Sequence, residues 1–345
     1  MKILITGGAG FIGSNFVHHI LRNYPSDQVV VVDKLTYAGN LGNLGAALKD
    51  ERLKFVRLDI CEPAVADAAR GCDAAVHFAA ESHVDRSIED ASPFVRTNVE
   101  GTWRMVEACR KSGVSRFVHV STDEVYGSQD DGRKFTETAS LNPTSPYAAS
   151  KAASDLMVLC AVKTHRFPAI VTRCTNNYGP FQFPEKFIPL MIAQAIAGKP
   201  LPVYGDGKNV RDWIHVADHC QALDLVLRKG REGEVYNIGG DCELENITVA
   251  RKILGGLGRP ETLLNFVTDR PAHDRRYALD CKKLKREFGW SPSRDFERGL
   301  AETIRWYQEN TAWLDETRSG EYQKYFERHY LRREARAAQS VKSGT

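Results

Sequence analysis

The sequence lacks long apolar runs and basic clusters. Its opening apolar stretch, Lys2–Thr6, leads directly into glycines and is too short for a signal peptide or a membrane span. The formal net charge is only +3 over 345 residues, and no long Lys/Arg run is interleaved with aromatics, which disfavours a nucleic-acid-binding protein. We therefore expect a cytoplasmic protein that binds neither membranes nor nucleic acid and whose anionic partners are small.

Cysteine pairing patterns are also missing. The eight cysteines include no C-x-x-C and no spacing typical of a zinc site. They are predicted to be reduced thiols that serve as small apolar side chains. His215 and His219 are four residues apart and would share a helix face, but the sequence offers no third ligand nearby. We therefore expect no metal.

What is present is ordinary for a globular protein. The chain is 42% hydrophobic and 26% charged, and it is long enough for two domains, or for one large domain with an added lobe. Short β-branched runs alternate with longer amphipathic stretches in the first half, which is the pattern of βαβ units. The runs are almost continuously apolar, as strands of a parallel sheet covered on both faces should be.

This alternation predicts an α/β fold with a doubly wound parallel sheet of the Rossmann type. We expect strands at Lys2–Thr6, Val29–Asp33, Lys54–Asp59, Asp73–Phe78, Arg116–Ser121 and Ala169–Arg173. The expected helices are Phe11–Asn23, Glu62–Arg70, Pro93–Ser112 and Tyr147–His165.

Prolines become frequent after Arg173 and the elements become shorter, which indicates a smaller C-terminal lobe that carries the substrate. We expect a Rossmann domain over residues 1–179, with a strand near 235–240 returning to its sheet. Residues 180–330 are expected to form mainly the lobe. Residues 331–345 are polar and basic and are expected to be a frayed tail.

Glycines follow the first expected strand and open the first expected helix. Gly8, Gly10 and Gly13 satisfy G-x-G-x-x-G, and Gly7, Gly10 and Gly13 satisfy the G-x-x-G-x-x-G spacing of short-chain dehydrogenases. Such a loop turns tightly, lets the backbone approach a pyrophosphate and points a helix N-terminus at it. Asp33 ends the second strand, where a carboxylate can bind the ribose 2′-hydroxyl of adenosine. The pattern predicts NAD rather than NADP.

A tyrosine and a lysine stand four residues apart at the start of an expected helix. Tyr147 and Lys151 would share one face of that helix, which begins after Pro146. A lysine cation near the phenol would lower the tyrosine pKa from about 10 and make it a base near neutrality. Y-x-x-x-K is common by chance, but here it lies downstream of a dinucleotide fingerprint. We therefore expect the pair to take a proton from a substrate hydroxyl as hydride leaves the same carbon.

An acidic triplet follows the apolar run at 117–120. Thr122, Asp123 and Glu124 would thus lie at the carboxyl end of a strand, where open α/β sheets bind ligands. Adjacent carboxyls raise each other's pKa, so one can stay protonated while the other is ionised. That division suits a general acid and a general base, although an ordinary acidic turn is an alternative.

At these residues the sequence resembles the dTDP-glucose 4,6-dehydratases, from Lys2 to about Tyr325. In that family the Thr-Asp-Glu triplet belongs to the dehydratases, whereas related 4-epimerases lack the acidic pair. The segments that carry the resemblance are 7–15, 33–40, 79–87, 122–127, 176–180, 184–186, 211–213 and 270–274.

The resemblance implies a role for each of five catalytic candidates. Tyr147 would take the C4 hydroxyl proton of dTDP-glucose, with Lys151 tuning it and Thr122 hydrogen-bonded to the same oxygen. Hydride would pass from C4 to NAD. Glu124 would then remove the C5 proton while Asp123 protonates the C6 hydroxyl, so that water leaves. Hydride would return to C6 and give the 4-keto-6-deoxy sugar.

The resemblance also implies two sets of binding residues. For the cofactor they are Gly7, Gly10, Phe11, Ile12, Gly13, Asp33, Lys34, Thr36, Asp59, Ile60, Ala79, Ala80, Ser82, Thr97, Tyr147, Lys151 and Asn177. For the sugar nucleotide they are Ser82, His83, Thr122, Asn176, Lys186, Arg211, Asn246, Arg270 and His273.

Other functions remain alternatives at this point. The Asp123–Glu124 pair disfavours a UDP-sugar epimerase or decarboxylase, but a 4,6-dehydratase for UDP or GDP sugars stays open. Thymine and uracil differ by one methyl group, which is worth only about 1 to 3 kcal/mol to a pocket. A silent NAD-binding module is disfavoured because all the catalytic candidates are intact. In related enzymes the helices equivalent to Pro93–Ser112 and Tyr147–His165 form a four-helix contact, so we expect a homodimer.

Overall fold

The computed structural model describes residues 1–129, 131–271 and 273–318. The tail expected over residues 331–345 lies outside these ranges. Within them, no helix is both long and apolar enough to cross a lipid bilayer.

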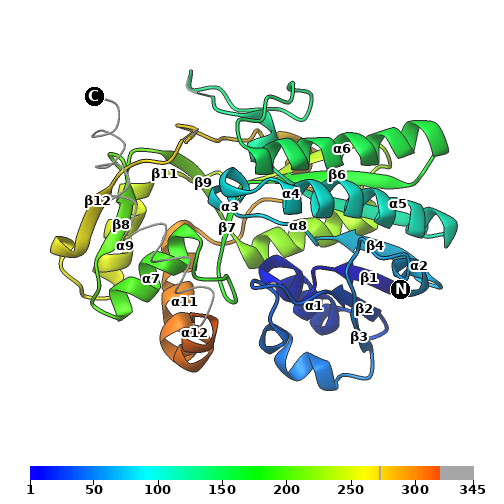
Figure 1. The fold of residues 1–345 in the computed structure, drawn as a ribbon, viewed down its shortest axis with the longest axis horizontal. Helices are drawn as coiled ribbons and strands as arrows, with labels where there is room; N and C mark the ends of the chain where they lie inside the picture. The colour runs from blue at the N-terminus through cyan, green and yellow to red at the C-terminus, as the bar shows by residue number, and fades with distance from the viewer. Residues whose placement is uncertain (130, 272, 319–345) are drawn as a thin grey trace.

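A seven-stranded sheet forms the core of the larger part of the molecule (Figure 1). Its strand order is β10-β6-β5-β4-β1-β2-β3, and all neighbouring strands are parallel. The order reverses between β1 and β4, which opens a crevice at the carboxyl ends of the strands. The strands are β1 (Lys2–Thr6), β2 (Gln28–Asp33), β3 (Leu53–Arg57), β4 (Ala74–His77), β5 (Arg116–Thr122), β6 (Ala169–Cys174) and β10 (Val235–Ile238).

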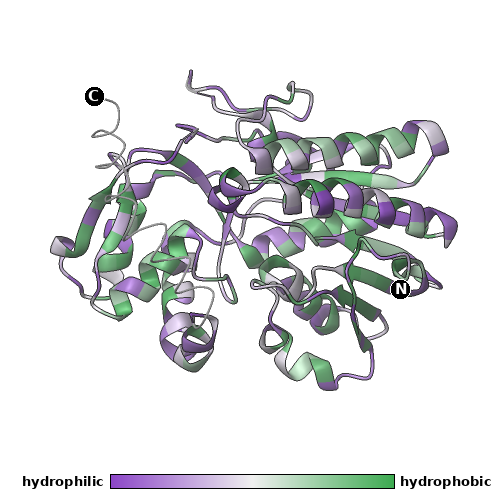
Figure 2. Cartoon of the chain, viewed as in Figure 1, coloured by the Kyte–Doolittle hydropathy of each residue, from purple (hydrophilic) through white to green (hydrophobic). Residues whose placement is uncertain are grey.

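Helices cover both faces of this sheet. One face packs against α1 (Phe11–Asn23) and α8 (Val216–Lys229), and the other against α2 (Val65–Ala69), α5 (Thr102–Lys111) and α6 (Pro146–His165). Successive residues of a strand point to opposite faces of the sheet. Because helices cover both faces, the residues that point to either face are apolar, and the strands are coloured mostly as hydrophobic (Figure 2). The expected doubly wound α/β fold is confirmed.

The smaller part is a lobe with its own apolar core (Figure 1). It contains a parallel pair of strands, β12 with β8, and a three-stranded sheet of order β11-β9-β7. The elements are β7 (Asn176–Tyr178), α7 (Phe187–Ile196), β8 (Leu201–Tyr204), β9 (Val210–His215), β11 (Glu243–Glu245), α9 (Asn246–Gly256), β12 (Leu264–Val267), α11 (Phe296–Glu309) and α12 (Thr311–Thr317).

Three elements from the second half of the chain pack with the large sheet. β10 pairs with β6, α8 packs against α1, and α10 (Lys282–Phe288) packs on β10. The chain therefore passes repeatedly between the sheet and the lobe. Residues that are far apart in the sequence meet where the two parts join.

The expected helix Pro93–Ser112 is not one regular α-helix. It begins as the short α4 (Ser92–Phe94), widens into a π-helix, η3 (Val95–Gly101), and ends as α5. π-Helical turns often occur at functional sites. Here the wide turns carry Thr97 to the cavity and Asn98 inward, where Asn98 Nδ2 donates to Ser150 Oγ at 2.8 Å and to the Glu81 carbonyl at 2.9 Å. Apolar periodicity predicts a helix but does not show this local widening.

Candidate active site

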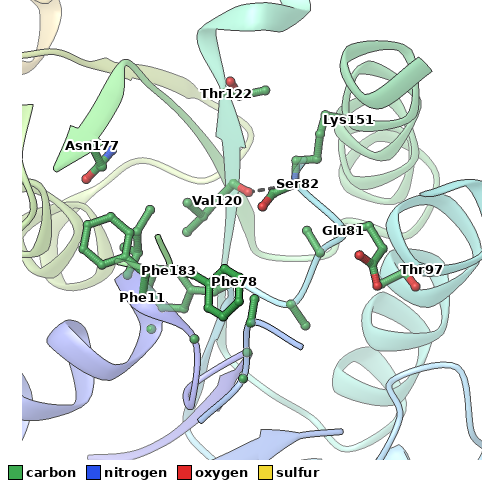
Figure 3. A pocket seen from close by; sticks show the side chains of 18 of the residues that line it. Phe11, Phe78, Glu81, Ser82, Thr97, Val120, Thr122, Lys151, Asn177 and Phe183 are labelled. Carbon is green, nitrogen blue, oxygen red and sulfur yellow. Dashed lines mark hydrogen bonds between the residues drawn. The ribbon is translucent and has the colours of Figure 1, made fainter. Parts of the chain in front are cut away.

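A cavity opens at the carboxyl ends of β1, β4, β5 and β6 (Figure 3). It lies at the strand-order reversal, where doubly wound sheets bind ligands. Most of the residues predicted for the cofactor and for catalysis line it. They are Gly7, Gly10, Phe11, Ile12, Gly13, Asp33, Lys34, Thr36, Ile60, Ala79, Ala80, Ser82, Thr97, Thr122, Asp123, Glu124, Tyr147, Lys151 and Asn177.

The glycine loop leaves no room for side chains. Gly7 has φ +69°, and a Cβ there would lie 2.7 Å from the Ala79 backbone nitrogen. A Cβ on Gly13 would lie 2.2 Å from the Gly7 carbonyl oxygen. The loop therefore needs glycine at both positions, and it presents the bare N-terminus of α1 to the cavity, which suits a pyrophosphate.

Asp33 is held rigidly at the end of β2. Its two carboxylate oxygens accept hydrogen bonds from the backbone nitrogens of Ala9 (3.0 Å) and Leu35 (2.8 Å). The neighbouring Lys34 ammonium is 3.6 Å from Asp59 Oδ2 and 4.0 Å from Glu81 Oε1. Carboxylates thus surround this end of the cavity, an arrangement that disfavours the extra phosphate of NADP. Asp59 itself does not line the cavity, but it forms an ion pair with Lys34, which does.

The tyrosine–lysine pair differs from the sequence prediction. Lys151 Nζ donates to the Val120 carbonyl at 2.9 Å (Figure 3). The pKa of Tyr147 is raised well above its ordinary value, chiefly by burial and then by the negative charge of Glu124, and only Thr122 lowers it through a hydrogen bond. The expected lowering of the Tyr147 pKa was wrong, because burial and the charge of Glu124 raise it. Burial also lowers the pKa of Lys151 to about 8.

The two carboxyls of the triplet lie in different environments. Asp123 is only 3% exposed, and its Oδ2 has no hydrogen-bond partner in the described part of the chain. Burial and the neighbouring Glu124 raise the pKa of Asp123 well above its ordinary range. Burial also raises the pKa of Glu124, but Arg270, Lys186 and Arg211 oppose the rise with their positive charges. The two carboxyls thus differ in the charges that surround them, and the division into acid and base stays a prediction.

The predicted substrate residues fall into three groups. Ser82, Thr122, Asn176 and Lys186 line the cavity, and Lys186 Nζ donates to the Ser82 carbonyl at 2.6 Å. Arg211 and Arg270 do not line it but place their charges near Glu124. The remaining three lie outside the cavity lining: His83 beside the Glu185 carbonyl, Asn246 at the start of α9, and His273 bonded to Asp269.

The cavity also uses residues that were not predicted from the sequence. Phe78, Val120 and Cys174 add apolar lining from the strand ends, while Gln182, Phe183 and Glu185 come from the loop before α7. The only sequence signal for Glu185 is its place in the matched segment 184–186. The others follow only from tertiary structure.

His215 and His219 each have a structural contact. His215 Nδ1 accepts from the Ala217 nitrogen at the start of α8, and His219 Nδ1 lies 2.8 Å from Asn177 Oδ1. Across residues 1–129, 131–271 and 273–318, no group of three or more His, Cys, Asp or Glu side chains is placed to hold a metal ion. The histidine pair therefore positions Asn177 and begins a helix.

The doubly wound sheet, the glycine loop and the buried tyrosine–lysine pair define a short-chain dehydrogenase of the extended type. A family model described as GDP-mannose 4,6 dehydratase matches residues 4–303. A dTDP-glucose 4,6-dehydratase from Actinoplanes sp. (strain SE50/110) is 51% identical over 91% of this chain and 99% of its own length. dTDP-glucose 4,6-dehydratase 1 of Escherichia coli K12 is 48% identical, covering 96% of this chain and 99% of its own.

Solved structures agree with these relatives. DesIV, a dTDP-glucose 4,6-dehydratase from Streptomyces venezuelae solved with NAD and TYD bound, superposes with a TM-score of 0.90 at 51% identity, covering 92% of this chain and all of its own. A UDP-glucose 4-epimerase from Thermus thermophilus with NAD has a TM-score of 0.83 at 30% identity, over 90% of this chain and all of its own. The chain belongs to the dTDP-glucose 4,6-dehydratase family.

Proposed function

We propose that this chain converts dTDP-glucose to dTDP-4-keto-6-deoxyglucose, with NAD held in the cavity. The observation that carries the proposal is a pair of adjacent carboxyls in unequal electrostatic surroundings, Asp123 and Glu124, that line one cavity with the buried Tyr147. The proposal is supported by two relatives that are named dTDP-glucose 4,6-dehydratase and by DesIV, a dTDP-glucose 4,6-dehydratase solved with NAD bound. We further propose that residues 1–179 chiefly hold the cofactor, that residues 180–330 chiefly hold the sugar nucleotide, and that the protein is cytoplasmic.

The residues present fit NAD. The glycine loop and the N-terminus of α1 would hold the pyrophosphate, and Asp33 would accept from the adenosine ribose. The chemistry that NAD supplies when bound is the transfer of a hydride from C4 of the sugar and its return to C6. Because hydride is returned within each turnover, the site has no need to release the cofactor.

Tyr147 would accept the proton of the C4 hydroxyl. Thr122 hydrogen-bonds the phenol and would orient the same substrate oxygen. Lys151 lies one helical turn further on, and its ammonium would stabilise the phenolate as the proton leaves. A positioned proton transfer of this kind contributes about 10²- to 10⁴-fold in rate.

Asp123 and Glu124 would share the loss of water. A protonated Asp123 can donate through its unpartnered Oδ2 to the departing C6 hydroxyl. Glu124, which three cations favour in its ionised form, would remove the C5 proton. The two transfers need opposite protonation states, and the unequal surroundings of the carboxyls supply them.

Arginine and lysine would bind the diphosphate. Arg211 is buried and Lys186 half-buried beside Glu124, and Arg270 Nε has no hydrogen-bond partner among the described residues. A guanidinium fork suits paired phosphate oxygens. Asn246 Oδ1 is also buried and unpartnered in the described ranges, which supports a place for it at the sugar nucleotide.

Product analysis tests this proposal directly. Purified protein incubated with dTDP-glucose should yield the 4-keto-6-deoxy product, detected by mass loss of one water and by the new ketone. UDP-glucose and GDP-mannose serve as parallel substrates. A faster reaction with either of these would transfer the assignment to another nucleotide-sugar dehydratase, and the absence of product from all three would reject dehydration.

A homodimer is the second part of the proposal. Val95 on η3 and Leu156 on α6 are 56% and 58% exposed, although both are apolar. A hollow on this surface is lined by Val95, Val99, Trp103 and Met157, among others. An apolar face of this kind on adjacent helices is typical of a subunit contact.

Light scattering should therefore give about twice the chain mass of 38.6 kDa at micromolar concentration. Leu156→Glu should shift the mass towards the monomer, because it would bury a charge in the contact. Phe266→Glu, which alters an equally exposed apolar residue on β12, is the matched control and should stay dimeric. A monomeric parent protein would reject the dimer.

A further inference from the structure

Helix α6 carries a third ionisable residue on the face that holds Tyr147 and Lys151. Asp155 follows Lys151 by four residues, as Lys151 follows Tyr147, and this spacing places all three on one side of the helix. Asp155 is 0% exposed and does not line the cavity.

Only one of the two carboxylate oxygens of Asp155 accepts a hydrogen bond within the described ranges. Oδ2 accepts from Arg173 Nε at 2.8 Å, and Arg173 Nη1 donates to the Tyr126 hydroxyl at 2.8 Å. Oδ1 lies 3.4 Å from His119 Nε2 but has no hydrogen-bond partner in the described part of the chain. A fully buried carboxylate is costly unless positive charge compensates it, and Arg173 is only one of the cations nearby.

Lys151 is the other cation. It is 4% exposed, and its single hydrogen bond given by the structure goes to a neutral carbonyl, that of Val120. Burial lowers the pKa of Lys151 to about 8, and Asp155 is the first of the charged groups that raise it. Asp155, four residues further along the same helix face, is thus the carboxylate that offsets the buried charge of Lys151.

The other ionisable groups around Lys151 do not replace Asp155. His119 on β5 is fully buried, and its pKa is lowered to about 4, so it is neutral near pH 7. His77 on β4 has a pKa lowered well below its ordinary value by burial, His119 and Lys151. Cys174 on β6 has its pKa raised to about 12, and that of Tyr126 is also raised to about 12, so both are neutral.

We infer that Asp155 is a positioning residue for the dehydration: its carboxylate is the counter-ion that keeps Lys151 in the ammonium form. The inference rests on the proposed function of Tyr147 and Lys151. The ammonium form persists below the pKa of Lys151 and is lost as the pH rises through it. Removal of Asp155 lowers that pKa, so the ammonium form, and with it the rate, should be lost at a lower pH.

The test is the pH profile of kcat for Asp155→Asn, which keeps the shape of the side chain and removes the charge. The alkaline limb of the profile should move towards acid by about one pH unit, while the rate recovers at low pH. Asp155→Glu keeps the charge and should leave the limb near its original position. A uniform fall in kcat at every pH, with the limb unmoved, would show a merely structural role and overturn the inference.

A second variant covers the case in which Asp155→Asn does not fold. The double change Asp155→Asn and Arg173→Gln removes the anion together with its paired cation, and it still leaves Lys151 without a counter-ion. The limb should again be displaced, and a wild-type limb in the folded double variant would also overturn the inference.

A direct titration separates this inference from the proposed function. NMR of isotope-labelled lysine in the NAD-bound protein, without sugar, reports the ionisation of Lys151, with Lys151→Met to assign the signal. An acid shift of that titration in Asp155→Asn supports the counter-ion role even if dTDP-glucose proves not to be the substrate. An unchanged titration would reject it even if dTDP-glucose is dehydrated.

Discussion

Glu124→Gln should leave the protein folded and loaded with NAD, yet reduce product formation from dTDP-glucose by about 10²- to 10⁴-fold. The amide has the shape of the carboxylate but cannot take the C5 proton. Arg211, Arg270 and Lys186 lose the negative charge that faces them, so they remain available to a diphosphate and sugar binding should not weaken. The measurement is kcat and KM, together with the NAD content after denaturation.

The same variant should stop after the oxidation step. Added sugar should leave the bound nicotinamide reduced, which is visible in its near-ultraviolet absorbance. Glu261→Gln makes the same chemical change at an exposed carboxylate paired with Arg251 and should behave like the parent. Wild-type turnover in Glu124→Gln would dismiss Glu124 as the base.

Tyr147→Phe should lose activity by a comparable factor, about 10²- to 10⁴-fold, but at an earlier step. The ring packs in a small apolar cluster with Val84 and Phe94, and phenylalanine preserves those contacts. Only the phenol oxygen that would accept the proton of the C4 hydroxyl is removed. We therefore expect an unchanged melting temperature and no reduced nicotinamide when sugar is added.

A matched control for this variant is Tyr24→Phe. The Tyr24 hydroxyl donates to Asp224 at 2.5 Å, and neither residue lines the cavity. Its loss should lower stability by about 1 kcal/mol, as for a typical hydrogen bond, without changing kcat. Accumulation of reduced nicotinamide in Tyr147→Phe would contradict the role of Tyr147 as the base that permits oxidation.

The two variants separate the oxidation of the sugar from the later loss of water. A block before hydride loss and a block after it give opposite spectral results with similar losses of turnover. Together they test whether the phenol and the carboxyl pair act in sequence on one sugar, which is the central claim of the proposed function.

Much of this site could be predicted from the sequence because many of its residues stand close together in short sequence motifs. The glycine loop, Asp33 at a strand end, and the Thr122–Glu124 triplet depend on short-range geometry. An apolar run that is followed by glycine or by an acidic residue predicts where a strand ends. The carboxyl ends of parallel strands meet at one edge, so these groups were expected together before any contact was known.

The pKa shifts of the site residues, and the contacts between residues far apart in the sequence, were decided only by the tertiary structure. The spacing of Tyr147 and Lys151 is visible in the sequence, but the direction of the Tyr147 pKa shift depends on burial and on Glu124. Arg211 and Arg270 reach Glu124 because the chain passes repeatedly between sheet and lobe. Asp155 meets Arg173 only when α6 packs on β6.

The sequence by itself thus determined the order of the main elements, the class of cofactor and the candidates for the reacting groups, since neighbouring residues and their periodicity carry that information. The charges that surround each carboxyl and each buried cation were decided by the folded chain. The physical reason is that desolvation and Coulomb interactions act through space between segments that no sequence spacing connects.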